Sequence, residues 1–223
     1  MSEQRLARKV LAEAVGSAAL LTAVVGSGIM GERLAGGNVA IALLANTLAT
    51  GTALVVLILA LGPISGAHLN PAVTLVELAG RRLAPTEAIA FMGAQVLGAI
   101  LGVILAHGMF EEPLLSLSTK VRAGPAQLLS EVVATFGLVM VIAGVSRARP
   151  AAVPAAVGLY IASAYWFTAS TSFANPAVTL ARSLTNTFAG IQPADAPGFI
   201  AAQLVGAALA VLGAHLLFPR ETR

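Results

Sequence analysis

The six-residue sequence NPAVTL occurs twice in the chain, at positions 70–75 and 175–180. Each copy begins with Asn followed by Pro; Asn is a favoured N-cap residue, and Pro suits the first position of a helix. Each copy therefore predicts the start of a helix, and the apolar segments run over 70–80 and 175–186. A helix of about ten residues reaches about 15 Å, half of the hydrocarbon core of a bilayer, so neither segment can span a membrane.

The chemistry available to these segments is hydrogen bonding to a neutral molecule. If the two helices enter a membrane from opposite faces, their N-termini meet near the middle, and each carries about half a positive charge. A positive potential there repels cations but not neutral polar molecules. The amides of Asn70 and Asn175 donate hydrogen bonds, and the unwound segments before them, SGAHL and STSFA, offer backbone carbonyls. The sequence thus predicts a narrow path with paired donors at its centre.

The rest of the chain has the composition of a membrane protein. It is 57% hydrophobic and only 10% charged, whereas a soluble domain is about 25% charged. Six apolar stretches are long enough to cross or nearly cross a bilayer. They run roughly over 10–30, 39–61, 88–110, 127–145, 151–169 and 198–218. The sequence predicts an all-α membrane protein with six transmembrane helices in a lipid bilayer.

Other chemistries find no support in the residues. The chain has no cysteine, and its histidines, His68, His107 and His215, are not at metal-ligand spacing on one helix. No run of Lys or Arg indicates nucleic-acid binding, and no Ser/His/Asp set converges on the predicted path. We therefore expect no cofactor, no metal, no nucleic-acid partner and no enzymatic activity. The first apolar stretch lacks a small-residue cleavage site and is interpreted as a retained span rather than a signal peptide.

Four features occur twice in the same order: a Glu within a span, Asn-Pro-Ala, a Gln and a His. The first set is Glu13, Asn70, Gln95 and His107, and the second is Glu131, Asn175, Gln203 and His215. The halves cover about 1–115 and about 120–223 of one transmembrane domain over 1–223. Each half contains three spans, and because three is odd the second half enters the membrane from the opposite side. The sequence predicts an inverted repeat.

The distribution of basic residues predicts the orientation, because Lys and Arg are in excess on the cytoplasmic side of membrane proteins. With both termini cytoplasmic, nine basic residues lie inside, namely Arg5, Arg8, Lys9, Arg81, Arg82, Arg147, Arg149, Arg220 and Arg223. Four lie outside or in the outer half-helix, namely Arg33, Lys120, Arg122 and Arg182. We expect a multi-pass protein of a bacterial-type inner (plasma) membrane.

The stretches SGAHLNPAVTL and SFANPAVTL, with a Glu in the first and fourth spans, resemble the aquaporin and aquaglyceroporin (major intrinsic protein) family over essentially the whole chain. The resemblance implies a right-handed bundle with two re-entrant half-helices and one pore per subunit, usually assembled as a homotetramer. The pore motifs that it implies are Asn70, Pro71, Ala72, Asn175, Pro176 and Ala177. It also implies that Glu13 and Glu131 accept hydrogen bonds from the re-entrant backbone and that His68 is a pore-side or loop-bracing residue.

The narrowest point of the family's pore is built from four positions, and this sequence departs from the family there. Val178 stands where arginine normally follows the second motif, and Thr50 replaces a usual Phe or Trp. The other two positions correspond to Ser163 and Ser172, with Phe173 in place of Ser172 if the stretch is aligned with a one-residue gap. Without the guanidinium, the constriction is expected to be wider and less polar.

Two neighbouring residues bear on the same question. Thr179 stands where the glycerol channels of the family have an Asp, so the sequence matches neither a standard water channel nor a standard glycerol channel. Arg182 follows Val178 by one helical turn. It either leans back to supply the missing charge or makes a structural or interfacial contact.

These departures resemble a bacterial subgroup with valine after the second motif, which is associated with trivalent metalloid hydroxides and methylated arsenic species. The sequence therefore predicts a passive channel for small neutral solutes, including these compounds as well as water. A channel mainly for water and a channel for glycerol-like polyols are the alternatives. A coupled secondary transporter is the competing class, because inverted repeats with broken helices also build transporters, and Glu13 and Glu131 would then form a proton relay.

Overall fold

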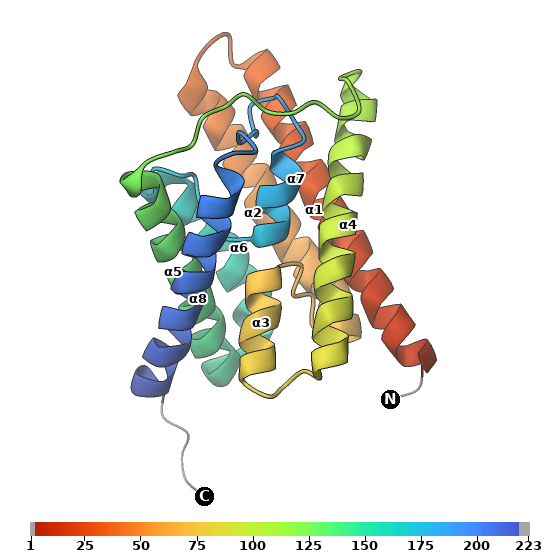
Figure 1. The fold of residues 1–223 in the computed structure, drawn as a ribbon, viewed down its shortest axis with the longest axis vertical. Helices are drawn as coiled ribbons and strands as arrows, with labels where there is room; N and C mark the ends of the chain where they lie inside the picture. Colours follow the sequence, from red (N-terminus) through yellow and green to blue (C-terminus); the bar gives the residue numbers. More distant parts are fainter. Residues whose placement is uncertain (1–2, 219–223) are drawn as a thin grey trace, which may run out of the picture.

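The structure, a computed structural model, describes residues 3–218 of the 223-residue chain. Six helices in this range are long and apolar enough to cross a membrane. They are α1 (Glu3–Leu34), α2 (Val39–Ser65), α4 (Pro85–Phe110), α5 (Pro125–Ala148), α6 (Val153–Phe167) with the 3₁₀ helix η1 (Pro150–Ala152) before it, and α8 (Ala196–Leu217). The predicted all-α architecture with six spans is confirmed for the described residues (Figure 1).

Two short helices complete the fold, α3 (Pro71–Ala79) and α7 (Pro176–Arg182). In Figure 1 they lie one above the other, enclosed by the longer helices, with α3 in the lower half of the bundle and α7 in the upper half. The predicted pair of re-entrant half-helices is thus confirmed. The second ends at Arg182 rather than at 186, because the chain turns there and the Ile191 N–H donates to the Arg182 carbonyl at 3.2 Å.

Prolines mark the helix starts more accurately than the apolar stretches do. The half-helices begin at Pro71 and Pro176, and two of the spans begin at Pro85 and Pro125. Proline lacks an N–H, which the first turn of a helix does not need, and its fixed φ already suits a helix. The first span begins earlier than the predicted 10–30, because polar turns extend α1 beyond its apolar part, where Lys9 pairs with Glu87 of α4 at 2.7 Å.

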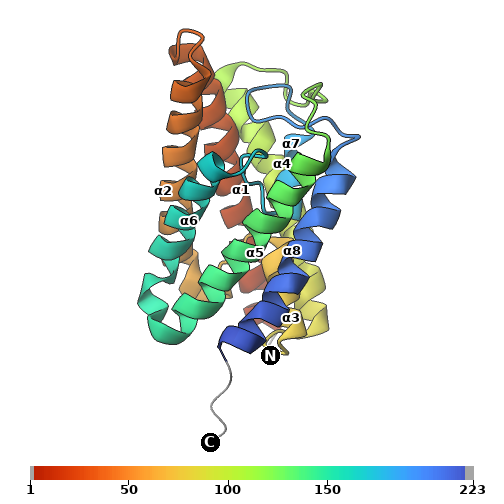
Figure 2. The ribbon, with the colours of Figure 1, turned by 90° about the vertical axis from the view of Figure 1, so that its left-hand side faces the viewer.

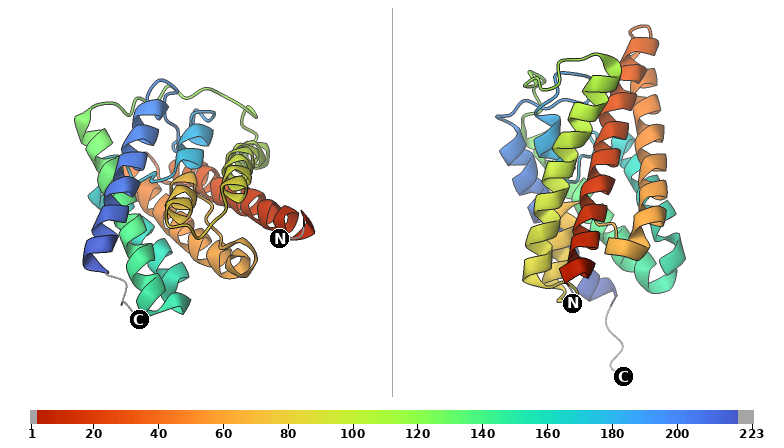
Figure 3. Two further views of the ribbon diagram at one scale, coloured as in Figure 1. Left: turned by 60° about the horizontal axis from the view of Figure 1, so that its bottom comes forward. Right: turned by 90° about the vertical axis from the view of Figure 1, so that its right-hand side faces the viewer.

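Each half is built around one close helix pair. In the first half α1 packs on α4, where a Cβ added to Gly98 or Gly102 would lie 2.2 Å from the backbone oxygen of Ala14 or Ala18. The second half repeats this pair with α5 and α8, since a Cβ at Gly206 would lie 2.4 Å from the Val132 oxygen. Figure 3 shows α1 lying between α4 and α2. Small residues permit such approach between membrane helices, where packing drives association.

The two halves are joined along α2 and α6, which lie side by side in Figure 2. A Cβ added to Gly158 of α6 would lie 2.5 Å from the Gly51 oxygen of α2. The contact therefore requires glycine at position 158, and a Cβ at Gly51 would lie a tight 3.0 Å from the Gly158 oxygen.

The start of α1 and the end of α8 lie at the same end of the bundle, which we call the termini end (Figure 1). The opposite end, the far end, is covered by the loop over 111–124, whose Ser118 N–H donates to the Ser183 carbonyl at 3.0 Å. Half-helix α3 points its C-terminus to the termini end and α7 to the far end (Figure 1). Arg220 and Arg223, used above to predict the orientation, lie outside the described residues.

Candidate functional site

A cavity of about 300 Å³ runs between the half-helices and the surrounding spans. Four helices line it with residues that recur every four positions, and so with one face each. These residues are Leu20 and Val24 on α1, Thr50, Leu54 and Ile58 on α2, Leu138, Ile142 and Ser146 on α5, and Val153, Val157, Ile161 and Tyr165 on α6. The face that each spanning helix turns to the cavity is therefore mainly apolar, with the hydroxyls of Thr50, Ser146 and Tyr165 as its polar groups.

Asn70 and Asn175, which precede the two half-helices, both line this cavity. The Asn70 amide nitrogen donates to the Ala174 carbonyl at 2.8 Å, and the Asn175 amide nitrogen donates to the Leu69 carbonyl at 2.8 Å. Each bond crosses from one half of the chain to the other. Because a side-chain amide carries two N–H groups, each Asn retains one that a molecule in the cavity can accept.

The amide oxygens of the same residues begin the half-helices. The Asn70 oxygen accepts from the Ala72 N–H at 2.9 Å, and the Asn175 oxygen accepts from the N–H groups of Ala177 and Val178 at 3.0 and 3.3 Å. The caps fix each side chain, so the donors are held in place before a molecule arrives.

The other motif residues are placed differently. Pro71, Ala72, Pro176 and Ala177 are buried at the first turns of the half-helices and are not part of the cavity wall. Ala72 packs in a cluster with Val139, Ala207 and Ala210, the last two on α8. These prolines and alanines therefore hold the half-helices in the bundle, and the asparagines alone among the motif residues face the cavity.

Glu13 of α1 supports the first re-entrant segment. Its Oε1 accepts from Ser65 Oγ at 2.6 Å and from the His68 N–H at 3.0 Å, and its Oε2 accepts from the Leu69 N–H at 2.7 Å and from Gln95 Nε2 at 2.8 Å. Leu69 has a φ of 50°, a conformation that side chains disfavour. The carboxylate compensates for this by accepting the N–H groups that the unwound backbone exposes.

Glu131 of α5 repeats the arrangement in the second half. Its Oε1 accepts from Ser170 Oγ at 2.6 Å and from the Phe173 N–H at 2.9 Å, and its Oε2 accepts from the Ala174 N–H at 2.9 Å and from Gln203 Nε2 at 2.6 Å. Both carboxylates are fully buried and both accept four hydrogen bonds. The structure thus places them against the re-entrant backbone, away from the cavity wall.

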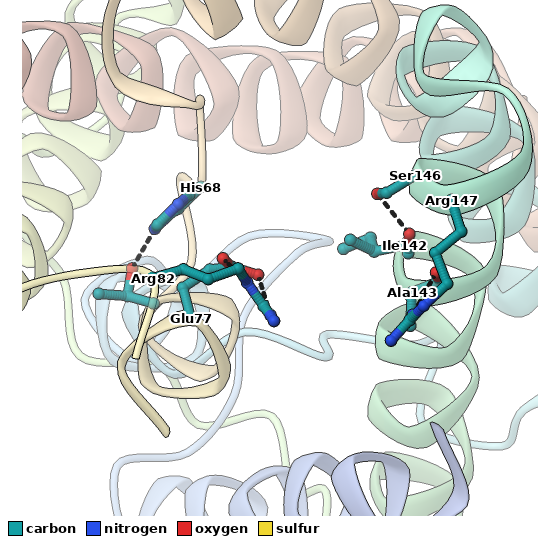
Figure 4. A network of polar contacts seen from close by, with 8 residues as sticks. His68, Glu77, Arg82, Ile142, Ala143, Ser146 and Arg147 are labelled. Atoms are coloured by element: carbon teal, nitrogen blue, oxygen red, sulfur yellow. Dashed lines mark hydrogen bonds and ion pairs between the residues drawn. The ribbon is translucent and has the colours of Figure 1, made fainter. Parts of the chain in front are cut away.

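His68 lies between the cavity and α3. It lines the cavity, its Nδ1 lies 3.1 Å from Thr74 Oγ1, and its ring meets the edge of Phe91 with 5.5 Å between centroids. Figure 4 shows the imidazole in this hydrogen bond beside α3. Its position between the cavity and α3 fixes the unwound segment from the cavity side.

Of the four predicted constriction positions, three lie on the cavity wall toward the far end. They are Thr50, Ser172 and Val178, and Phe173, the alternative to Ser172, lines the wall as well. The Ser172 hydroxyl is buried without a hydrogen-bond partner among residues 3–218. Ser172 lines the cavity, but its hydroxyl oxygen is covered by the surrounding atoms.

Ser163 does not lie where the family alignment places it. It is exposed on the outer face of α6, while Ile161 and Tyr165 line the cavity. Successive residues of one helix face lie three or four positions apart, so a residue two positions from each of these points elsewhere. Tyr165 occupies the place instead, and its hydroxyl donates to Thr50 Oγ1 at 3.2 Å. The four-residue spacing on α6 was the signal in the sequence that could have identified it.

Arg182 is buried at the far end of the cavity and belongs to its wall. Its Cζ lies 3.4 Å from the centroid of the Phe173 ring, and its Nε donates to the Ala189 carbonyl. Arg122, from the loop over 111–124, approaches the same ring with its Cζ at 5.0 Å. Phe173 thus contacts two guanidinium groups.

Lys120 adds a third positive charge to this end, and its Nζ donates to the Phe188 carbonyl at 2.8 Å. Partial burial, together with the charges of Arg122 and Arg182, lowers the pKa of Lys120 to about 8. The far end therefore gathers basic groups, and the structure brings together there residues that the sequence places far apart.

The termini end of the cavity is polar in a different way. Glu77 of α3 accepts from Arg82 Nε and Nη2 at 2.5 and 2.7 Å, and this hydrogen bond raises the pKa of Arg82. Figure 4 shows this pair facing Ser146 and Arg147 of α5 across open space. Glu77 and Ser146 also border a second cavity of about 750 Å³ between α3, α5 and α8. The two cavities adjoin there.

Comparison with known proteins agrees with this geometry. The family model described as MIP, major intrinsic protein, matches residues 1–162. Aquaglyceroporin AqpS of Rhizobium meliloti (strain 1021) is 58% identical over 211 residues, which cover 95% of this chain and 90% of the relative. Aquaporin NIP2-2 of Zea mays is 33% identical over 196 residues, which cover 83% and 65% of the two chains.

A solved structure gives the same fold. The X-ray structure of the aquaglyceroporin from Plasmodium falciparum matches with a TM-score of 0.73 at 20% identity, covering 93% of this chain and 94% of that one. The family model covers more than half of the chain, and the relative at 58% identity covers nearly all of it. The chain belongs to the major intrinsic protein family.

Proposed function

We propose that this protein is a passive channel for small neutral solutes. The observation that supports the proposal best is the junction of the two half-helices, where Asn70 and Asn175 each retain an amide N–H in a cavity lined from both halves of the chain. The two helix N-termini add a positive potential at the same place. Neutral molecules that accept hydrogen bonds are favoured there, and cations are not. The name of the relative AqpS, an aquaglyceroporin, supports the same class of function.

The competing class is a coupled transporter that uses Glu13 and Glu131 as a proton relay. Each carboxylate accepts four hydrogen bonds, two of them from the backbone N–H groups of a re-entrant segment. A relay residue must exchange its proton during each cycle, which here would require the re-entrant backbone to lose its acceptors. The channel is therefore favoured, with both glutamates in a structural role.

The solutes that we propose are trivalent metalloid hydroxides and methylated arsenicals, as well as water and glycerol-like polyols. The side chain of Val178, at the position after the second motif, offers no N–H group, and Thr50 and Tyr165 add hydroxyls to this part of the wall. Hydroxyls both donate and accept, so they can replace part of the hydration shell of a neutral hydroxide. A constriction without a guanidinium at position 178 leaves room for solutes larger than water.

We further propose a homotetramer in a bacterial inner (plasma) membrane, with the termini end in the cytoplasm and the two repeats, about 1–115 and about 120–223, forming one domain over 1–223. Large apolar side chains on α2, such as Leu44, Leu48 and Leu59, are exposed in the single chain. They provide surface for lipid or for a neighbouring copy.

Reconstitution into proteoliposomes tests the function. Stopped-flow swelling with glycerol and an uptake assay with arsenite are compared with the same lipid without protein. We expect solute flux that rises linearly with the gradient and is unchanged when a protonophore removes the proton gradient. Flux that saturates and stops with the protonophore would support the coupled transporter instead.

A further inference from the structure

The guanidinium of Arg182 is the buried cation of the cavity wall. Its side chain belongs to the last residue of α7, is 2% exposed and reaches the far end of the cavity. The ring of Phe173 lies under it, with 3.4 Å from Cζ to the centroid, and the Ala189 carbonyl accepts its Nε. These contacts fix the position of the charge beside the route that a solute takes.

This charge is not neutralised by an acid. Within residues 3–218, Asp and Glu side chains form ion pairs with Lys9, Arg33 and Arg82, and none forms one with Arg182. Asp195, the nearest acid in the loop that follows α7, accepts instead from the backbone N–H of Arg122 at 2.7 Å. A buried cation without a counter-ion is costly, and an aromatic face and a carbonyl dipole offset only part of the cost.

Proteins retain such a charge where its field is useful. A side chain of similar length without a charge would fill the same space over Phe173 and avoid the cost of desolvation. The field of Arg182 acts at the far end of the cavity, and that of the half-helix N-termini at its centre. A cation that enters from the far end therefore meets a positive potential from Arg182 before it reaches Asn175.

We propose that Arg182 is the fixed positive charge that excludes cations from this pore. It lies one helical turn nearer the far end than Val178, and it supplies the charge that the valine at position 178 lacks. Because its guanidinium lies over the Phe173 ring and its Nε donates to the Ala189 carbonyl, we infer that it supplies charge without extending its N–H groups across the constriction beside Val178. A wide constriction and cation exclusion are thereby compatible. This inference rests on the proposed channel function.

The proposal is tested by measuring the leak of protons and ammonium ions and the flux of a neutral solute on the same vesicles. Proteoliposomes containing the wild type, Arg182→Gln or Arg182→Lys receive a potassium diffusion potential with valinomycin, and a trapped pH dye reports proton entry. Glycerol swelling is measured on the same vesicles. We expect Arg182→Gln to raise the cation leak about tenfold, the order that one unit charge at short range produces in a medium of low dielectric constant. The ratio of cation leak to glycerol flux should rise by about the same factor, and Arg182→Lys should keep this ratio at the wild-type value.

Arg122 provides the matched control. It lies near the same ring of Phe173, at 5.0 Å, but is not part of the cavity wall. Arg122→Gln removes an equal charge from the far end, and we expect a cation leak clearly smaller than that of Arg182→Gln. A second control restores the charge, since Val178→Arg combined with Arg182→Gln should abolish the leak. If Arg182→Gln does not assemble, Arg182→Met takes its place in both comparisons, because its long apolar side chain keeps the packing on Phe173 without the charge.

Three results would overturn the proposal. They are an unchanged leak in Arg182→Gln with intact glycerol flux, an equal leak in Arg182→Lys, and a leak in the double variant equal to that of Arg182→Gln. An equal leak in Arg182→Lys would mean that Arg182 holds the Phe173 ring in position and does not act through its charge. A wild type that carries no neutral solute would instead contradict the proposed function, so the two failures are distinct.

Discussion

At the scale of single residues, Val178 is the position at which selectivity by size should be decided. Val178→Arg places a long side chain with several N–H groups beside Thr50 and Tyr165. We expect glycerol and arsenite flux to fall by about tenfold and water flux by less than about threefold, because the narrowed pore still passes the smallest solute. Swelling and uptake on one vesicle preparation measure this.

A matched control for this variant is Ser163→Arg. Ser163 is exposed on the other face of α6, so the same side chain there should leave all three fluxes unchanged. Equal losses of water, glycerol and arsenite in Val178→Arg would contradict a role for Val178 in selection by size.

Lys120 gives a residue-scale prediction about pH. Burial and two neighbouring positive charges favour the neutral form of the Lys120 amine and lower its pKa to about 8. At that pH about half of the amine is neutral, whereas less than about one per cent of an ordinary lysine is neutral there. The rate of acylation, followed by mass spectrometry, should therefore rise with a midpoint near pH 8. Arg122→Gln should move the midpoint upward. A midpoint near that of free lysine in the wild type would contradict the environment described for the far end.

At the scale of elements, the close helix pairs depend on single glycines. Gly98→Ala would bring a Cβ to 2.2 Å from the Ala14 backbone oxygen, which cannot move without separating α1 from α4. We expect a loss of about 2 kcal/mol or more in the free energy of unfolding. Thermal unfolding in detergent, followed by circular dichroism, measures it.

Gly93 offers the control within the same helix. A Cβ added there meets nothing within 4 Å, so Gly93→Ala should leave stability unchanged or raise it. If both variants unfolded at the same temperature, the close approach of α1 and α4 would not be what stabilises the first half.

At the scale of the whole molecule, the two halves have the same arrangement of helices, but the two repeated histidines make different contacts. His107 is fully buried and lies 2.6 Å from Thr185 Oγ1, whereas its counterpart in the repeat, His215, is exposed near the termini end. At the far end, His107 of α4 and the loop over 111–124, which carries Lys120, are hydrogen-bonded to the segment that follows α7. His215 Nδ1 instead lies 2.7 Å from the Val211 carbonyl of its own helix.

The proposed orientation gives a prediction for the whole molecule. Lys9 lies near the start of α1 at the termini end, and Lys120 lies at the far end; they are the two lysines of the chain. In intact cells, an amine reagent that cannot cross membranes should label Lys120 and leave Lys9 unlabelled, and permeabilised cells should give both products. Labelling of Lys9 alone in intact cells would reverse the orientation.

The sequence by itself determined those features that depend on local chemistry. The two Asn-Pro starts, the short segments after them and the six apolar stretches predict eight helices, because capping, proline geometry and hydrophobic length act within a few residues. The order of Glu13, Asn70 and Gln95, repeated later, led to the supporting roles of the glutamates through the family resemblance. The structure places those carboxylates on the re-entrant backbone.

The identity of the residues that face the cavity was decided only by the tertiary structure. Counting back from Asn175 selected Ser163, whereas the rotation of α6, set by its contact with α2 through Gly51 and Gly158, turns Tyr165 inward. The burial of Arg182 against Phe173 likewise depends on a loop that returns over α7. Helix rotation and loop return are fixed by packing between distant segments, and a count along one chain does not contain that information.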